Sequence, residues 1–194
     1  GFYYLTNGLS WAFFRNGIAH LEQHIRYGSL DRMLLKPVNP IFLLSFFEVD
    51  FTRLVDVGVG VFIICLQISH SGVDITLTSV AGAMVAVILG LVFIFCLFLS
   101  VNMLSFWMTE TYLDHLINPV FTVSKYPADL WGKYSWLLYW VAPVAFMSTV
   151  PAGVLYGKMS WNVVLAGLVL VVIWILVIRI YWRLAIRNYS SVGS

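Results

Sequence analysis

Charged side chains are scarce in this sequence. Only 10% of the 194 residues are Asp, Glu, Lys or Arg, against about 25% in soluble globular domains, and the mean hydropathy is +0.90. Residues 75–109 and 159–178 contain no charged side chain, and about 20 apolar residues suffice to cross a bilayer as a helix. This scarcity excludes a soluble domain, and such long uncharged runs favour helices over the roughly ten-residue strands of a membrane barrel. We therefore expect an all-α, polytopic membrane protein.

Several chemical motifs are absent as well. No G-x-x-x-x-G-K-[ST] loop for ATP phosphates occurs, so we expect no cofactor in this chain, and no basic run interleaved with aromatic residues indicates nucleic acid. Cys65 and Cys96 lie in apolar runs, where packing is a cysteine's ordinary role. His20 and His24 stand one helical turn apart, but HLEQH departs from the H-E-x-x-H pattern of zinc hydrolases. We therefore expect no metal site and no enzyme, and an intramembrane hydrolase is retained only as a third alternative.

Basic residues indicate which side of the membrane each loop occupies. Five of them fall close together: Arg15, Arg26, Arg32, Lys36 and Arg53. By the positive-inside rule they place residues 15–53 in the cytoplasm. Three more, Arg179, Arg183 and Arg187, follow the last apolar run at four-residue intervals and place the C-terminus on the same side. Residues 1–23 read as the end of a span that runs into the cytoplasm, so we expect sequence upstream of Gly1.

Hydropathy and turn residues predict where the membrane segments begin and end. Asn39 followed by Pro40 is a favourable helix start, so an interfacial helix is expected at 40–54. The run from Thr78 to Thr109 is too long for one span, and the segment LSVN (99–102) is its least apolar point, where we expect a tight turn. The sequence therefore predicts spans at 55–70, 79–99, 103–122 and 159–181.

One region allows two topologies. Residues 134–157 are apolar but interrupted by Pro143 and Pro151, which suits two short pieces that dip into the membrane. Alternatively, residues 107–133 stay inside and 134–157 cross fully, which the positive-inside rule slightly favours. Hydropathy alone leaves both open.

The stretch IRYGSLDRMLLKPVNPIF, residues 25–42, is unusually polar for this chain. Gly28 is expected to end one helix in the left-handed conformation, Ser29 to cap a short helix at 29–36, and Pro37 to stop it. Leu30, Met33 and Leu34 share one face of that helix, and Asp31, Arg32 and Lys36 lie largely elsewhere. Such a helix suits either a lipid surface or a soluble partner.

The same stretch resembles the cytoplasmic loop of type 2 ABC exporter permeases, where a basic residue, Gly, an acidic residue, LL, a basic residue and PVNP recur in that order. The resemblance continues in SFWMTE (105–110), NPVFTVSKYPADLW (118–131) and VAPVAFMSTVPAGVLYGK (141–158). It therefore covers nearly the whole chain. The family has six spanning helices with both termini inside, of which about five have room here.

The resemblance implies that 103–122 span the membrane, that 126–156 re-enter from outside, and that 29–36 form a coupling helix seated in a groove of a separate ATPase subunit. The residues expected to make that contact are Gly28, Leu30, Asp31, Arg32, Met33, Leu34, Lys36 and Pro37, with Leu30, Met33 and Leu34 gripping the ATPase. Asn102 in the expected turn, and Glu110 and Asp114 in the span 103–122, are candidates for the translocation path. The alternative for Glu110 and Asp114 is a place near the inner interface, where they stay hydrated or pair with Arg53 or Arg15.

The implied complex has two permeases, the same or homologous, and two ATPase subunits that bind ATP and Mg²⁺, in a bacterial plasma (inner) membrane whose lipids are further partners. The permease would work by alternating access along the permease interface, with no covalent chemistry of its own. A second hypothesis is a membrane scaffold that holds a cytoplasmic partner without moving a substrate. Paired small residues, Gly58 with Gly60 and Ala81 to Ala83, are expected to permit close helix contact.

Overall fold

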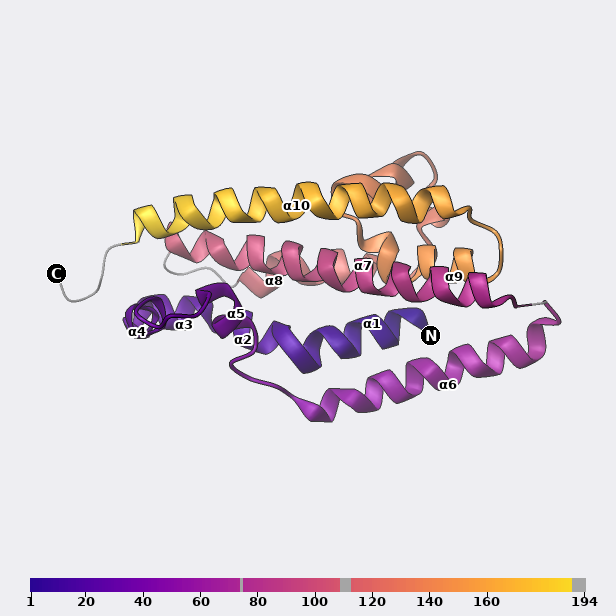
Figure 1. Ribbon diagram of the computed structural model, residues 1–194, viewed down its shortest axis with the longest axis horizontal. Coiled ribbons are helices and arrows are strands. Elements are labelled where there is room, and N and C mark those ends of the chain that lie inside the picture. Colours follow the sequence, from indigo (N-terminus) through magenta and orange to yellow (C-terminus); the bar gives the residue numbers. More distant parts are fainter. Residues whose placement is uncertain (74, 109–112, 190–194) are drawn as a thin grey trace.

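Three long apolar helices dominate the computed structural model of this chain, which describes residues 1–73, 75–108 and 113–189 (Figure 1). Helix α6 (Leu54–Ser71) directly follows the 3-10 turn η2 (Phe51–Arg53), and α7 (Leu77–Asn102) continues into the 3-10 turn η3 (Met103–Phe106). The third helix is α10 (Trp161–Asn188). All three are long and apolar enough to cross a membrane. Within the described ranges all regular structure is helical, as expected from the composition.

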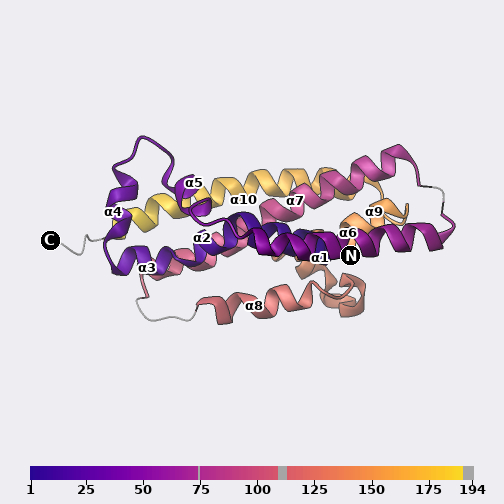
Figure 2. The same ribbon diagram turned by 90° about the horizontal axis from the view of Figure 1, so that it is seen from below.

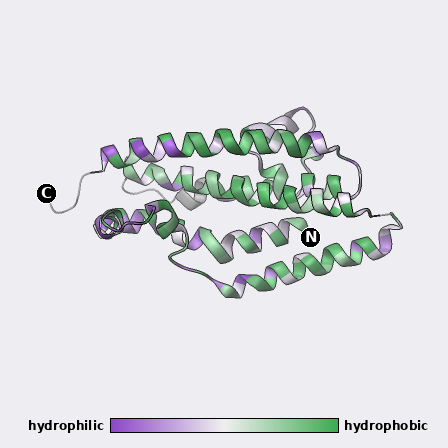
Figure 3. Ribbon diagram, in the orientation of Figure 1, coloured by the Kyte–Doolittle hydropathy of each residue, from purple (hydrophilic) through white to green (hydrophobic). Residues whose placement is uncertain are grey.

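Helix α7 lies at the centre of the molecule, between α10 on one side and α1 (Phe2–Ser10) on the other, and α6 flanks α1 (Figures 1 and 2). Its central place is reflected in burial: 44% of the apolar window of α7 is buried, compared with 6% for α6. Figure 3 shows apolar residues along nearly the whole of α7 and polar residues at the ends of α10. The core therefore forms around α7.

The turn expected at residues 99–102 is wrong, because α7 continues through that segment to Asn102. The two polar side chains there bond back to their own helix: Ser100 Oγ donates to the carbonyl of Cys96 at 2.8 Å, and Asn102 Nδ2 donates to the carbonyl of Phe98 at 2.9 Å. A polar side chain satisfied in this way does not break a helix. The segment LSVN contains neither glycine nor proline, so nothing else interrupts the helix.

The helix expected at 103–122 is interrupted at Trp107 and Met108 within its described part, and residues 109–112 lie outside that part. The helix that contains η3 ends at Phe106, and Trp107 and Met108 lie outside it, although the N–H of Met108 still donates to the carbonyl of Leu104 at 3.0 Å. A separate helix, α8 (Leu113–Val123), follows and contains Pro119. Its 11 residues would extend only about 16 Å at 1.5 Å per residue, so α8 by itself is shorter than the hydrocarbon core of a bilayer.

Residues 126–156 form short elements rather than one long helix. These are the 3-10 turns η4 (Ala128–Tyr134) and η6 (Val144–Met147), the π-helical turn η5 (Leu137–Val141) and helix α9 (Thr149–Leu155). Two prolines, Pro127 and Pro143, and two glycines in the left-handed conformation, Gly132 and Gly157, interrupt or follow these elements. Helix α9 and η6 pack against α7, so this region covers the central helix near one end of the molecule.

A chain of short helices forms the opposite end. The π-helical turn η1 (Trp11–Arg15) and helices α2 (Asn16–Ala19) and α3 (Leu21–Arg26) continue from α1, and α4 (Ser29–Leu34) and α5 (Pro40–Ser45) follow. We call this the α4 end, and the opposite one the α9 end (Figure 1). Asn39 caps α5 as expected, since its Oδ1 accepts from the N–H of Ile41 at 3.0 Å. The interfacial helix expected at 40–54 is shorter, because α5 stops at Ser45.

Candidate functional site

A short helix, α4, lies within the range expected at 29–36, but it ends at Leu34, three residues before the expected stop at Pro37. Gly28 has φ of 65°, in the left-handed region expected for it. It is also the residue that precedes the helix, so the prediction that Ser29 caps α4 is wrong. Ser29 is the first helical residue, and its Oγ instead forms a 2.7 Å hydrogen bond with Nδ1 of His24. Helix α4 is thus fixed to α3 by a side-chain bond as well as by the turn.

The inner face of α4 is apolar and packs inside the chain. Leu30 is 1% exposed and belongs to the same core cluster as Leu21 of α3 and Leu44 of α5. Met33 is also buried, and Leu34 packs partly against this cluster. The expectation that Leu30 and Met33 grip a partner is therefore wrong: the face that the sequence marks as apolar is already covered by α3 and α5.

The outer side of α4 and the turn that follows it at residues 35–37, together called the outer face of α4, carry different residues. Arg32, Lys36 and Pro37 are exposed, and Leu35 has 85% of its surface exposed. The structure therefore leaves Arg32, Leu35, Lys36 and Pro37 available to a partner, and Leu35 is a residue that the sequence interpretation missed.

The inner edge of α4 also meets the end of α10. The carboxylate of Asp31 lies beside the phenol of Tyr189, which directly follows α10. Burial raises the pKa of Tyr189, and the negative charge of Asp31 raises that pKa further. Tyr189 in turn contacts the ring of Phe106 in η3, with centroids 6.0 Å apart. Tyr189 thus links Asp31 of α4 to Phe106 of η3.

A cavity of about 220 Å³ opens beside α4, between α3 and the segment after α5. His20 Nδ1 lies 3.1 Å from Oε2 of Glu48, and the ring of His24 meets that of Phe47 edge-on. Burial lowers the pKa of His24, and the neighbouring His20 lowers it further, whereas Glu48 opposes this shift. Among the described residues no three His, Cys, Asp or Glu side chains are grouped to hold a metal ion.

Comparison with known proteins agrees with this architecture. The family model described as "ABC-2 family transporter protein" matches residues 1–193. The chain belongs to this family. No curated protein and no solved structure matches the chain. Members of the ABC-2 transporter membrane family are typically permeases without an ATPase domain of their own, which accords with the lack of a phosphate-binding loop in this sequence.

Of the three candidate path residues of this ABC-2 protein, only Asn102 lies where the structure describes side chains. Asn102 is buried at the end of α7. Its side-chain amide donates to the main-chain carbonyl of Phe98, and its main-chain carbonyl accepts from Ser105 Oγ at 2.7 Å. Glu110 lies outside the described residues. Asp114 lies in α8, outside the part whose side chains are described.

The ABC-2 chain also buries a charge that hydropathy placed in water. Arg15 is 2% exposed, at the end of the π-helical turn η1. Its guanidinium lies 4.1 Å from the ring centroids of both Trp11 and Phe121, and 4.8 Å from that of Phe98. Its Nη1 donates to Asn7 Oδ1 at 3.1 Å. Arg15 therefore joins η1 to α7 and α8, which sequence spacing did not indicate, because Phe98 and Phe121 are far away along the chain.

Proposed function

We propose that this chain is the permease subunit of an ATP-driven ABC exporter and that its ATPase subunit docks on the outer face of α4. Membership of the ABC-2 family supports the transporter class. The observation that carries the docking site is the shape of α4: a short helix anchored by a buried inner face and carrying an exposed outer face with Arg32, Leu35 and Lys36.

This anchoring makes α4 suitable for transmitting force. Because Leu30 and Met33 are buried against the chain's own core, a push on the outer face moves α3 and α5 with α4 instead of bending it. Asp31 lies beside Tyr189, so the same movement reaches the end of α10. The segment that moves as a unit extends from Gly28 to Pro37. ATP and Mg²⁺ would be bound by the partner ATPase, of which two copies serve a pair of permeases.

The proposal also assigns the sides of the membrane. The α4 end carries Arg26, Arg32 and Lys36, and the last helix ends there with Arg183 and Arg187, so the positive-inside rule supports a cytoplasmic location for this end. Residues 126–156, at the α9 end, would then enter the membrane from outside. The translocation path would run between two permeases, with Glu110 and Asp114 as its candidate polar residues.

Charge-reversing changes on the outer face of α4 test the docking site. The double variant Arg32→Glu/Leu35→Asp should reduce co-purification of the ATPase by at least about tenfold. Losing an interface hot spot weakens the binding free energy by about 2 kcal/mol, which lowers the affinity by more than tenfold. The variant should elute like the wild type in detergent, because both side chains are exposed. Arg187→Glu, a charge reversal at the same end on α10, is the matched control and should retain the ATPase.

Undiminished association of the double variant would contradict docking on this face. A scaffold would bind the ATPase equally well, so a second measurement separates the two hypotheses. A permease predicts vanadate-sensitive ATP hydrolysis that a transported substrate stimulates, and this stimulation should disappear in the double variant. Hydrolysis that no candidate substrate changes would favour the scaffold.

A further inference from the structure

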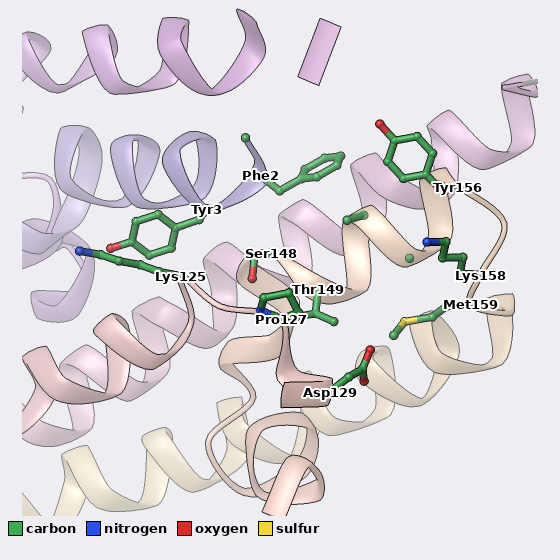
Figure 4. Close-up of a pocket in the computed structure, with 13 residues that line it drawn as sticks. Phe2, Tyr3, Lys125, Pro127, Asp129, Ser148, Thr149, Tyr156, Lys158 and Met159 are labelled. Carbon is green, nitrogen blue, oxygen red and sulfur yellow. The ribbon is translucent and has the colours of Figure 1, made fainter. Parts of the chain in front are cut away.

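A pocket of about 380 Å³ lies at the α9 end, far from α4 (Figures 1 and 4). Three separate segments line it: the start of α1, the connection between α8 and η4, and α9 with the turn that follows it. The side chains that matter for its chemistry are Phe2, Tyr3, Lys125, Asp129, Tyr156, Lys158 and Met159. The pocket is thus amphipathic, with charged groups at its edge and apolar groups in its wall.

Its backbone framework is fixed by hydrogen bonds between these segments. Ser148 Oγ donates to the carbonyl of Ser124 at 2.7 Å, and the N–H of Ala128 donates to Thr149 Oγ1 at 3.0 Å. These two bonds tie the start of α9 to the connection between α8 and η4. Hydrogen bonds therefore connect the segments that line the pocket, which is not merely a gap between independent loops.

The position of Lys158 is fixed by the turn after α9. Gly157 has φ of 66°, which reverses the chain. The N–H groups of Lys158 and Met159 then both donate to the carbonyl of Gly153, at 2.8 and 3.0 Å. The turn therefore presents Lys158 and Met159 to the same pocket.

The charged groups of the pocket alternate in sign. Lys125 and Lys158 lie at opposite sides of the pocket in Figure 4, and Asp129 lies between and below them. Lys125 Nζ is 5.7 Å from the ring centroid of Tyr3. Asp129 Oδ1 accepts a long hydrogen bond, 3.5 Å, from Tyr139. In the described ranges none of these three charged groups forms an ion pair with another residue.

We expect the pocket to lie at the depth of lipid headgroups. Met159 is followed within two residues by Trp161, the half-exposed first residue of the spanning helix α10. Tryptophan at a span end is typical of the membrane–water boundary. Lysine side chains near that boundary place their ammonium groups at the level of lipid phosphates.

We propose that this pocket binds the headgroup of a phospholipid that carries both a phosphate and a primary ammonium group, as phosphatidylethanolamine does. Lys158 holds the phosphate, Asp129 holds the ammonium group, and Phe2 and Met159 contact the glycerol region, with Lys125 at the opposite side of the pocket. Asp129 decides the choice of headgroup, because its carboxylate repels a purely anionic one. The bound lipid would join α1, α9 and the connection after α8. This inference does not depend on an ATPase.

Lipid retention by the purified full chain tests the proposal. The protein is exchanged into micelles that contain equimolar phosphatidylethanolamine, phosphatidylglycerol and phosphatidylcholine, and native mass spectrometry measures which lipid stays bound. The wild type should retain phosphatidylethanolamine preferentially. Lys158→Ala should lower its retention about tenfold, the loss expected for one charge-assisted hydrogen bond. Lys133→Ala, which removes a lysine of the same region outside the pocket, should match the wild type.

Two further variants examine selectivity and space. Asp129→Asn should abolish the preference for phosphatidylethanolamine over phosphatidylglycerol while keeping total phospholipid retention. Ala152→Leu adds bulk to a lining residue of α9 and should reduce retention of all three lipids. Unchanged elution and helical content show that each variant is folded, so that a loss of lipid is a loss of the site.

Soluble competitors distinguish a headgroup site from a site for free phosphate. Phosphoethanolamine should displace the lipid, and inorganic phosphate at the same concentration should not. Equal displacement by both, equal lipid retention by Lys158→Ala and Lys133→Ala, or an unbiased lipid distribution in the wild type would each overturn the proposal. None of these outcomes bears on coupling through α4, because no ATPase is present.

Discussion

Helices α6 and α7 are consecutive, apolar and long enough to span, yet their surroundings are opposite. The apolar window of α6 is 6% buried and that of α7 is 44% buried. Small residues account for part of this difference. Gly90 brings α7 against the backbone of Phe146, and Gly82 brings it against Val154 and Trp161, whereas Gly58 of α6 has no neighbour within 4 Å. Hydrophobicity thus does not distinguish the two helices: α7 packs on α1, α9, α10 and η6, whereas α6 packs mainly on α1, at Gly60.

Removing a buried ring from α7 should have the largest effect on this comparison. Phe93 is 1% exposed and its ring centroid lies 5.0 Å from that of Phe146. Phe93→Ala should lower the free energy of unfolding by about 3–5 kcal/mol, because it leaves a cavity in the core. Titration with SDS in mixed micelles, followed by circular dichroism, measures this change.

The matched control is the same truncation on α6. Phe62 is 62% exposed, so Phe62→Ala removes contacts with lipid or detergent and should change the free energy of unfolding by less than about 0.5 kcal/mol. Similar losses for Phe93→Ala and Phe62→Ala would refute the view that α7 is the core helix and α6 a flanking one.

Adding a methyl group to α7 should come next in size. A Cβ at Gly90 would collide with the carbonyl oxygen and carbonyl carbon of Phe146, which belong to the backbone and cannot rotate away. Gly90→Ala should therefore cost about 1–3 kcal/mol by overpacking, despite the better helix propensity of alanine. A thermal unfolding midpoint equal to that of the wild type would show that η6 does not press on α7 in this way.

The same distinction explains how far sequence reasoning could go. Glycine, asparagine and proline around α4 have local effects, so Gly28 as a left-handed turn and Asn39 as a cap are both confirmed. Both ends of α6 and the start of α10 lie within two residues of the predicted spans because charge and hydropathy are also local properties, whereas α10 continues to Asn188, beyond the predicted end at 181. The sequence does not show what covers an apolar helix face, because lipid, a partner protein and the chain's own core are all apolar.

Leu30 and Met33 illustrate that limit. Their helical spacing correctly predicted one apolar face of α4, but the choice between lipid and a partner did not include the third possibility, burial against α3 and α5. The burial of Arg15 was missed for a related reason. A positive charge is expected to lie in water unless aromatic rings from distant parts of the chain enclose it. The turn expected at residues 99–102 failed because Ser100 and Asn102 bond to their own helix.

Arg15 provides a prediction of intermediate size on the α7 side. Arg15→Lys keeps the charge but loses the planar group stacked between Trp11 and Phe121, together with the bond to Asn7. We expect a loss of about 1–2 kcal/mol in the free energy of unfolding, the size of a desolvated cation–π contact with a charge-assisted hydrogen bond. The same detergent titration measures it. Arg53→Lys is the control, because the guanidinium of Arg53 lies 5.4 Å from the Trp11 ring and is half exposed. If both variants lose the same free energy, the enclosure of Arg15 has no special role.

The smallest expected effect concerns the open face of α6. A Cβ at Gly58 meets no atom within 4 Å, so Gly58→Ala should stabilise the isolated chain by about 0.5–1 kcal/mol through helix propensity alone. A Cβ at Gly60, two residues further on, would instead meet the backbone of Leu5, and Gly60→Ala should destabilise the chain. Opposite signs for these neighbouring variants would show that one face of α6 packs on α1 while the other is free within this chain. If Gly58→Ala stabilises the chain in detergent but weakens the permease pair measured by crosslinking, then a second permease, and not lipid, covers this face in the assembled transporter.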